Sequence, residues 1–327
     1  VRDLEGAFNR VLAHARFLLS AGRAAEAASE LEALVAANPD AGSLHTRLAG
    51  ARFAAGDTEG ARSAYQEALR LSGQEDPGAL LGLGRLELAA GRHPEAMGFA
   101  RRLIGLHPDA AAGPLLEGDI HRAQDRPDAA AEAYARALAK AGSTEIVLKL
   151  HAAHRLAGDE AAALGTLTDW LEAHPEDTRA RLVLAGSHQG AGRRNEAIAQ
   201  YRRVLETRPD HPVALNNLAW MRHEDDDRGE ALDLAERAHE VAPGNPSIMD
   251  TLGWLRVEGG QLERGLRLLE RAVEASPDSP DIRYHRAVAL ARAGESDRAR
   301  RELESLLASE VPFPGRDEAK ALLVELP

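Results

Sequence analysis

The chain has 327 residues, 40 Lys and Arg against 52 Asp and Glu, and a formal net charge of −12, which argues against a dedicated nucleic-acid binder. It contains no cysteine, so disulfides, zinc–thiolate sites and cysteine nucleophiles are excluded, and no apolar run approaches the ~18 residues of a membrane span. Aromatic residues make up only 4%, and this composition favours closely packed helices over a β-sandwich.

A small residue recurs along the whole chain with a spacing of 33 to 35 residues. The recurring positions are Ala27, Ala61, Ala96, Ala130, Ala163, Ala197, Ala231, Gly265 and Ala299. A second small residue lies twelve positions upstream of each of these, except in the fifth unit, where His151 stands instead. Such a fixed period indicates a repeat architecture in which each unit buries its apolar face against the next.

Each unit predicts two amphipathic helices. A glycine separates the two helical stretches in seven units, and it can adopt the left-handed conformation that ends a helix. A proline closes six of the nine units, because proline cannot continue a helix. The two small positions would then allow the helices of one pair to approach closely.

At these small-residue, glycine and proline positions the sequence resembles the tetratricopeptide repeat (TPR) family. The resemblance covers residues 8–313 as nine units that begin at residues 8, 42, 77, 111, 144, 178, 212, 246 and 280. It implies an all-α fold, a right-handed α-solenoid, and we expect residues 1–327 to form a single solenoid. Residues 314–327 are expected to form a helix that caps the last unit.

In the TPR family the first helices of successive units line a concave groove. On the first six units this assignment gives a basic stripe that includes Arg85, Arg122 and Arg155, whereas the groove turns acidic over the last three units. The stripe either binds an acidic partner segment or consists of long charged side chains that solvate a wide groove.

The last three units have the most unusual inner positions. The string Leu215-Asn-Asn-Leu-Ala-Trp recurs one repeat later as Met249-Asp-Thr-Leu-Gly-Trp, and Tyr284-His285 follows in the ninth unit. Aromatic rings beside amide and carboxylate groups suit a peptide side chain or a sugar ring, although the tryptophans could instead pack between helices. In these units the candidate partner-binding residues are Asn216, Asn217, Trp220, Asp250, Trp254, Tyr284 and His285.

Signals for catalysis or metal binding are weak. His151 and His154 could share a metal ion, but no third ligand lies at helical spacing, so His151 is better explained as a packing residue. The acidic run from Glu224 to Asp227 lacks the pattern of a calcium loop and is expected to cap a helix. With no phosphate loop, nucleophile elbow or zincin motif, we predict a non-enzyme without metal or cofactor.

The expected function is a scaffold that holds a protein or peptide partner in its groove. Residues 210–307 are similar to the C-terminal repeats of bacterial TPR proteins of exopolysaccharide and PEP-CTERM/exosortase systems, often outer-membrane lipoproteins. That similarity implies a role in envelope polysaccharide or surface-protein export, in the periplasm or at the outer membrane, with any signal peptide or anchor upstream of residue 1. The alternatives are a polysaccharide-binding module that uses Trp220 and Trp254, and a cytoplasmic regulatory adaptor.

Overall fold

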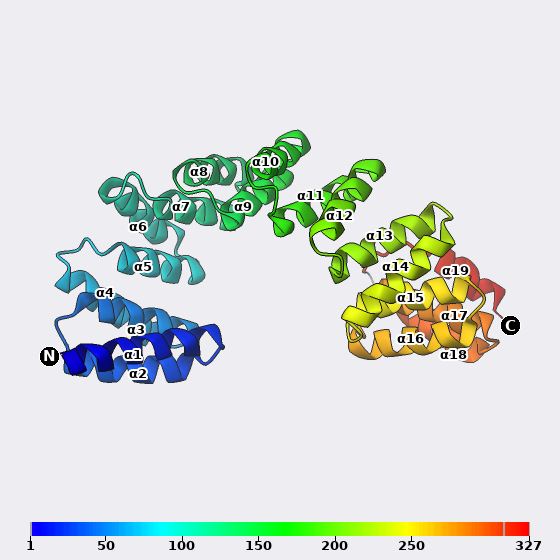
Figure 1. The fold of residues 1–327 in the computed structure, drawn as a ribbon, viewed down its shortest axis with the longest axis horizontal. Coiled ribbons are helices and arrows are strands. Elements are labelled where there is room, and N and C mark those ends of the chain that lie inside the picture. Colours follow the sequence, from blue (N-terminus) through cyan, green and yellow to red (C-terminus); the bar gives the residue numbers. More distant parts are fainter. Residues whose placement is uncertain (1, 310, 327) are drawn as a thin grey trace. The chain divides into compact units, whose positions relative to one another are not determined.

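The structure is a computed structural model that describes residues 2–309 and 311–326, with side chains from residue 9 onward. These residues form nineteen α-helices and no β-strand (Figure 1). By its internal contacts the chain divides into two compact units, Val1–Glu172 and Ala173–Pro327, here called unit 1 and unit 2, and each is described by itself. The expectation of a single solenoid over residues 1–327 stays a prediction.

The helices of unit 1 are α1 (Arg2–Ser20), α2 (Ala24–Ala37), α3 (Gly42–Ala54), α4 (Thr58–Leu71), α5 (Pro77–Ala89), α6 (His93–Leu106), α7 (Ala112–Ala123), α8 (Pro127–Lys140), α9 (Thr144–Leu156) and α10 (Glu160–Ala173). Those of unit 2 are α11 (Thr178–Gly190), α12 (Arg194–Thr207), α13 (Pro212–Glu224), α14 (Arg228–Val241), α15 (Pro246–Glu258), α16 (Leu262–Ala275), α17 (Pro280–Arg292), α18 (Ser296–Ala308) and α19 (Arg316–Glu325). From the second repeat onward, each first helix begins within one residue of the repeat start expected from the sequence.

Within each unit the helices form pairs, and each pair packs against the next pair along the chain. The first helix of a pair contacts its own second helix and also the first helix of the neighbouring pair, as α5 contacts α7 and α15 contacts α17. The first helices α3, α5 and α7 of unit 1 therefore lie side by side, and so do α13, α15 and α17 of unit 2 (Figure 1). This arrangement is the TPR-like solenoid that the repeat pattern predicts.

The recurring small residues lie where the two helices of a pair pack closely together. Ala61 and Ala231 are fully buried, and so are the other alanines at this position of the repeat. In the eighth repeat a Cβ atom on Gly265 would stand 2.5 Å from the carbonyl oxygen of Gly253. The helices of that pair thus cross with no room for a side chain, and the hydrophobic core continues on both sides of each crossing.

The turn inside each pair depends on one residue with positive φ. The seven predicted glycines all have φ between 70° and 86°. In the two repeats that lack the glycine, Asp125 (φ 55°) and Asp226 (φ 59°) adopt the left-handed conformation instead. Aspartate tolerates this region better than most residues because its short side chain can form local hydrogen bonds.

The trailing segment covers the last repeat, as expected. Helix α19 and the preceding Phe313, which is 7% exposed, pack on Leu303 and Leu306 of α18. Tyr284 of α17 also contacts this cluster. The apolar face of the ninth repeat is thereby removed from water.

Candidate functional site

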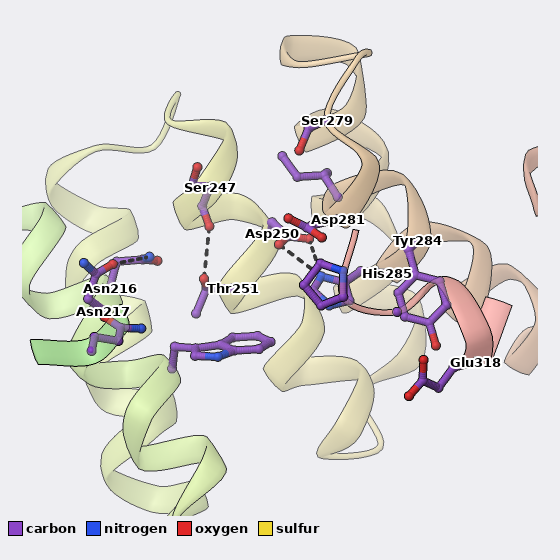
Figure 2. Close-up of a pocket in the computed structure, with 15 residues that line it drawn as sticks. Asn216, Asn217, Ser247, Asp250, Thr251, Ser279, Asp281, Tyr284, His285 and Glu318 are labelled. Atoms are coloured by element: carbon purple, nitrogen blue, oxygen red, sulfur yellow. Dashed lines mark hydrogen bonds and ion pairs between the residues drawn. The ribbon is translucent and has the colours of Figure 1, made fainter. Parts of the chain in front are cut away.

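The first helices of the last three repeats, α13, α15 and α17, together with the segment before α19, enclose a cavity of about 590 Å³ in unit 2. In Figure 2 the two asparagines of α13 lie on one side of this cavity and Tyr284 with Glu318 on the other, with Asp250 and His285 between them. The lining residues are Gln189, Asn216, Asn217, Trp220, Ser247, Asp250, Thr251, Ser279, Asp281, Ile282, Tyr284, His285, Pro314, Gly315 and Glu318.

The repeat explains why these side chains meet. Position 9 of a repeat lies three residues after position 6 and four after position 5, so its side chain is a neighbour of both on the surface of the first helix. Adjacent first helices are in contact, so the same positions of successive repeats become neighbours. Seven candidate residues are predicted in the last three repeats. Six of them line the cavity, and the seventh, Trp254, lies just outside its wall.

A carboxylate–imidazole pair lies at the centre. Nδ1 of His285 on α17 lies 2.9 Å and 3.0 Å from the two carboxylate oxygens of Asp250 on α15. Both side chains are only 12–13% exposed. Because a carboxylate can only accept, Nδ1 carries the proton, and the bond fixes the orientation of the ring.

The aromatic residues pack around this imidazole. The Trp254 ring stacks on His285 with 4.5 Å between ring centroids and 21° between planes, and Arg292 lies 5.5 Å from the Trp254 centroid. Trp220 is 5.8 Å from His285 and donates its Nε1 hydrogen to Glu224, 2.8 Å away. Trp254 therefore serves mainly to hold His285, whereas Trp220 forms part of the cavity wall.

The asparagines form the opposite wall. Asn217 donates to the hydroxyl of Tyr201 at 2.9 Å, and that hydroxyl donates to Oε1 of Gln189 at 3.0 Å. Asn216 is 9% exposed, and its carbonyl oxygen Oδ1 is buried without any hydrogen-bond donor in the described part of the chain. Leaving such a buried acceptor without a donor costs about 1–3 kcal/mol, so an N–H group that reached this oxygen would gain that free energy.

The cavity is electrically negative. Asp250, Asp281 and Glu318 line it, with His285 as the only basic group among the lining residues. Asp281 and Glu318 are exposed and form no ion pair within residues 9–309 and 311–326. Burial, together with the charge of Glu318, raises the pKa of Tyr284, so its phenol stays protonated at neutral pH.

The sequence did not indicate the contribution of the trailing segment. Gly315 packs so tightly that a Cβ atom there would lie 2.4 Å from the Tyr284 ring, and Glu318 follows on α19. These residues lie outside the repeats, so repeat positions could not assign them to the inner face.

The predicted basic residues lie in unit 1. Arg85 on α5, Arg122 on α7 and Arg155 on α9 are all exposed, and none has a carboxylate partner within ion-pair distance among the described side chains. The nearby carboxylate of Asp119 is already bound by Lys149, at 2.6 Å, and by the Tyr134 hydroxyl, at 2.7 Å. These three arginines therefore remain available to an acidic partner.

The candidate metal ligands have structural roles. His151 is 3% exposed, and its Nδ1 lies 3.0 Å from the carbonyl oxygen of Ala163, the small residue of the facing helix. In the acidic run, Asp227 caps α14 and Asp225 receives Arg194 at 2.7 Å. Within the residues described, no group of three His, Asp or Glu side chains could hold a metal ion.

The tetratricopeptide repeat models and the Cut9–Hcn1 structure agree with the fold. Models of the tetratricopeptide repeat match residues 12–76, 47–111, 154–221 and 251–315. The crystal structure of an APC/C hetero-tetramer, Cut9–Hcn1, superposes with a TM-score of 0.57 at 14% identity, covering 91% of this chain and 58% of that chain. A crystal structure of MamA gives a TM-score of 0.42 at 19% identity, over 53% of this chain and 96% of that one.

The chain thus spans little more than half the length of the Cut9–Hcn1 chain that it resembles. The comparison with curated protein sequences gave no match. None of the described helices is both long enough and apolar enough to cross a membrane.

Proposed function

Because the chain belongs to the tetratricopeptide repeat family, whose members generally bind protein partners, we propose that it is a non-catalytic scaffold that holds a partner segment in the cavity of unit 2. The segment places a lysine or arginine side chain between Trp220 and the carboxylates. The observation that carries this proposal is the buried Oδ1 of Asn216, an acceptor without a donor in a cavity rich in carboxylates.

The chemistry of the walls favours a cationic, hydrogen-bond-donating group. Asp281 and Glu318 offer unpaired negative charge, and Asn216 offers a buried acceptor. Trp220 adds an aromatic surface, which attracts cations by the ring quadrupole. A cavity of about 590 Å³ is in the size range of sites that enclose one small ligand or side chain.

The Asp250–His285 pair acts in this proposal as a positioning element. No hydroxyl of the described chain hydrogen-bonds to His285, and the ring is stacked on Trp254. The pair thus supplies a fixed polar surface and no activated nucleophile.

A peptide library tests the proposal. Fluorescently labelled peptides with one variable position are titrated against the wild type, and we expect Arg and Lys to be selected over Leu and Glu. The variant Asp281→Asn should weaken the binding of the selected peptides, because it removes an unpaired carboxylate. Its matched control is Glu145→Gln at the same repeat position in unit 1, which should leave binding unchanged. Selection of Glu over Arg would refute the proposal.

The glycan alternative depends on both tryptophans as stacking platforms. The Trp254 ring is already in contact with His285 and Arg292, so Trp220 is the tryptophan left to the cavity. Titration with neutral oligosaccharides distinguishes peptide binding from glycan binding. A sugar that competes with the selected peptide would favour glycan binding.

We further propose that the scaffold works in the bacterial envelope, in the periplasm or at the outer membrane, in export of exopolysaccharide or surface protein. The similarity of residues 210–307 to the C-terminal repeats of PEP-CTERM/exosortase-system proteins supports this setting. Fractionation of cells that express the full-length protein tests it, and recovery in the cytoplasmic fraction would favour the regulatory-adaptor alternative.

A further inference from the structure

A second cavity, of about 400 Å³, lies in unit 2 away from the site described above. It lies between α14 and α16, the second helices of the seventh and eighth repeats, and α15 contributes one residue. Its lining residues are His239, Arg256, Arg264, Arg267, Leu268 and Arg271. No carboxylate is among them, although the whole chain has a net charge of −12, and we call this site the arginine cleft.

The sequence of α16 produces the cleft. Arg264, Arg267 and Arg271 are spaced by three and four residues, so they lie on one face of the helix. Leu268 between them is 6% exposed and anchors that face in the core. The three arginines are exposed, and none of them forms an ion pair with any side chain that the structure describes.

Two deeper groups of the cleft each have one polar atom without a partner. Arg256 donates to Glu236 at 3.0 Å through Nη2, but its Nε is buried without an acceptor. Nδ1 of His239 is likewise buried without a partner. Burial, followed by the charges of Arg271 and Arg256, lowers the pKa of His239.

The same groove between the first two repeats provides a comparison inside the molecule. There Arg52 bonds to Glu32 at 2.7 Å, as Arg256 bonds to Glu236 six repeats later. The other positions differ: Val35 stands where His239 does, Ser63 where Arg267 does, and Glu67 where Arg271 does. A single arginine–glutamate link thus joins consecutive repeats, and packing does not require the additional basic residues of the arginine cleft.

From this geometry we propose that the arginine cleft binds a phosphate group, carried by a small soluble phosphate compound or by a phosphorylated side chain. Guanidinium groups bind phosphate oxygens through pairs of parallel N–H bonds, which makes arginine the preferred residue for such ligands. The unpaired donor of Arg256 and the unpaired ring nitrogen of His239 give the bound oxygens additional hydrogen-bonding groups at the base of the cleft.

Calorimetric titration tests the proposal at constant ionic strength with two probes, pyrophosphate and a phosphoserine heptapeptide. We expect the double variant Arg267→Ser/Arg271→Glu, which copies the residues of the first groove, to weaken binding at least tenfold. Arg271→Lys keeps the charge but removes the planar fork, so it should weaken binding by a smaller factor. The control Arg101→Ser/Arg203→Glu makes the same change in net charge at two exposed arginines elsewhere and should retain the wild-type affinity.

The relative affinities of the two probes identify the source of the phosphate. Tighter binding of the phosphopeptide than of pyrophosphate and of the unphosphorylated peptide assigns the site to a modified protein, and the reverse order assigns it to a small phosphate compound. Failure of both probes to bind, or an equal loss of affinity in the cleft variant and the control, would overturn the proposal. Because the substituted residues are exposed, melting temperatures should stay close to that of the wild type.

Discussion

The first helices of the two units carry different side chains on their inner faces. In unit 1 the exposed Arg85 is at position 9 of its repeat, and the exposed Arg122 and Arg155 are at position 12 of theirs. In unit 2 tryptophan is at position 9, aspartate at position 5 and histidine at position 6, around a cavity. The packing positions do not differ in this way, since Ala61 and Ala231 are both fully buried. The repeat therefore separates two tasks: small buried residues set the helix crossings, and the inner face is free to carry the chemistry of binding.

The largest expected effect concerns the inner face of unit 2. If the Trp220 ring anchors the ligand, we expect Trp220→Ala to weaken the binding of the selected basic peptide by more than about 2 kcal/mol, which is roughly thirtyfold in Kd. Stability should change little, because Trp220 is half-buried at the cavity wall. Peptide titration and thermal unfolding on the same variant check both parts.

Trp254→Ala is the matched variant, one repeat later. It removes the ring on which His285 stacks, so it should cost part of the ~3–5 kcal/mol typical of a fully buried tryptophan. If Trp254→Ala leaves the melting temperature unchanged while Trp220→Ala lowers it, the roles assigned to the two rings must be exchanged.

The next effect tests whether the packing positions are equivalent in the two units. Ala61→Leu in unit 1 and Ala231→Leu in unit 2 should each cost about 1–3 kcal/mol, because the larger side chain cannot fit the helix crossing. Denaturant unfolding measures the loss, with the exposed Ala135→Leu on α8 as the control. A loss in one unit alone would show that the crossings are not equivalent.

His151 stands at the second small position of the fifth repeat, where the other repeats have alanine or glycine. Its burial makes the stability of the fold depend on pH. Burial lowers the pKa of His151 in the folded state, so the unfolded chain binds more protons and stability falls as the pH drops below about 6.5. The stability lost by pH 5 should be smaller in His151→Ala than in the wild type, by up to ~1.4 kcal/mol for each unit between the folded and unfolded pKa values.

The wild type and this variant should both retain some pH dependence, because burial also lowers the pKa of His211 and His239 in unit 2. Thermal unfolding at pH 7.5 and pH 5 measures the difference. Parallel losses in the two proteins would mean that His151 accepts a proton without cost to the fold.

The smallest effect concerns the inner face of unit 1. Replacing Arg85, Arg122 and Arg155 by glutamate should slow the association of a labelled poly-glutamate peptide several-fold and flatten its salt dependence. The control replaces Arg101, Arg126 and Lys140 by glutamate. These residues are exposed and lie outside the first helices, so the net charge changes equally. Equal association kinetics in the wild type and the inner-face variant, across salt concentrations, would show that the arginines only solvate the groove.

The sequence was sufficient for the repeat because the spacing of small residues and glycines is a local property. Ala231 at the helix crossing and Gly22 in the turn each follow from steric needs that every repeat shares. The same register is enough to place Asn216 and Asp250 on the inner face. The helix starts and the capping role of the trailing segment were predictable for the same reason.

Only the tertiary structure decided which of these side chains meet. The bond between Asp250 and His285 joins residues 35 positions apart, and its geometry depends on how α15 and α17 cross. Glu318 enters the cavity from outside the repeats, and no periodicity could indicate it. The sequence did not indicate the arginine cleft, because the cleft lies between second helices. Charged residues at helical spacing on such helices are typical of a solvated surface. The sequence by itself determined the helices and their order through local sterics, whereas the sites depend on distances between repeats that only the packed chain defines.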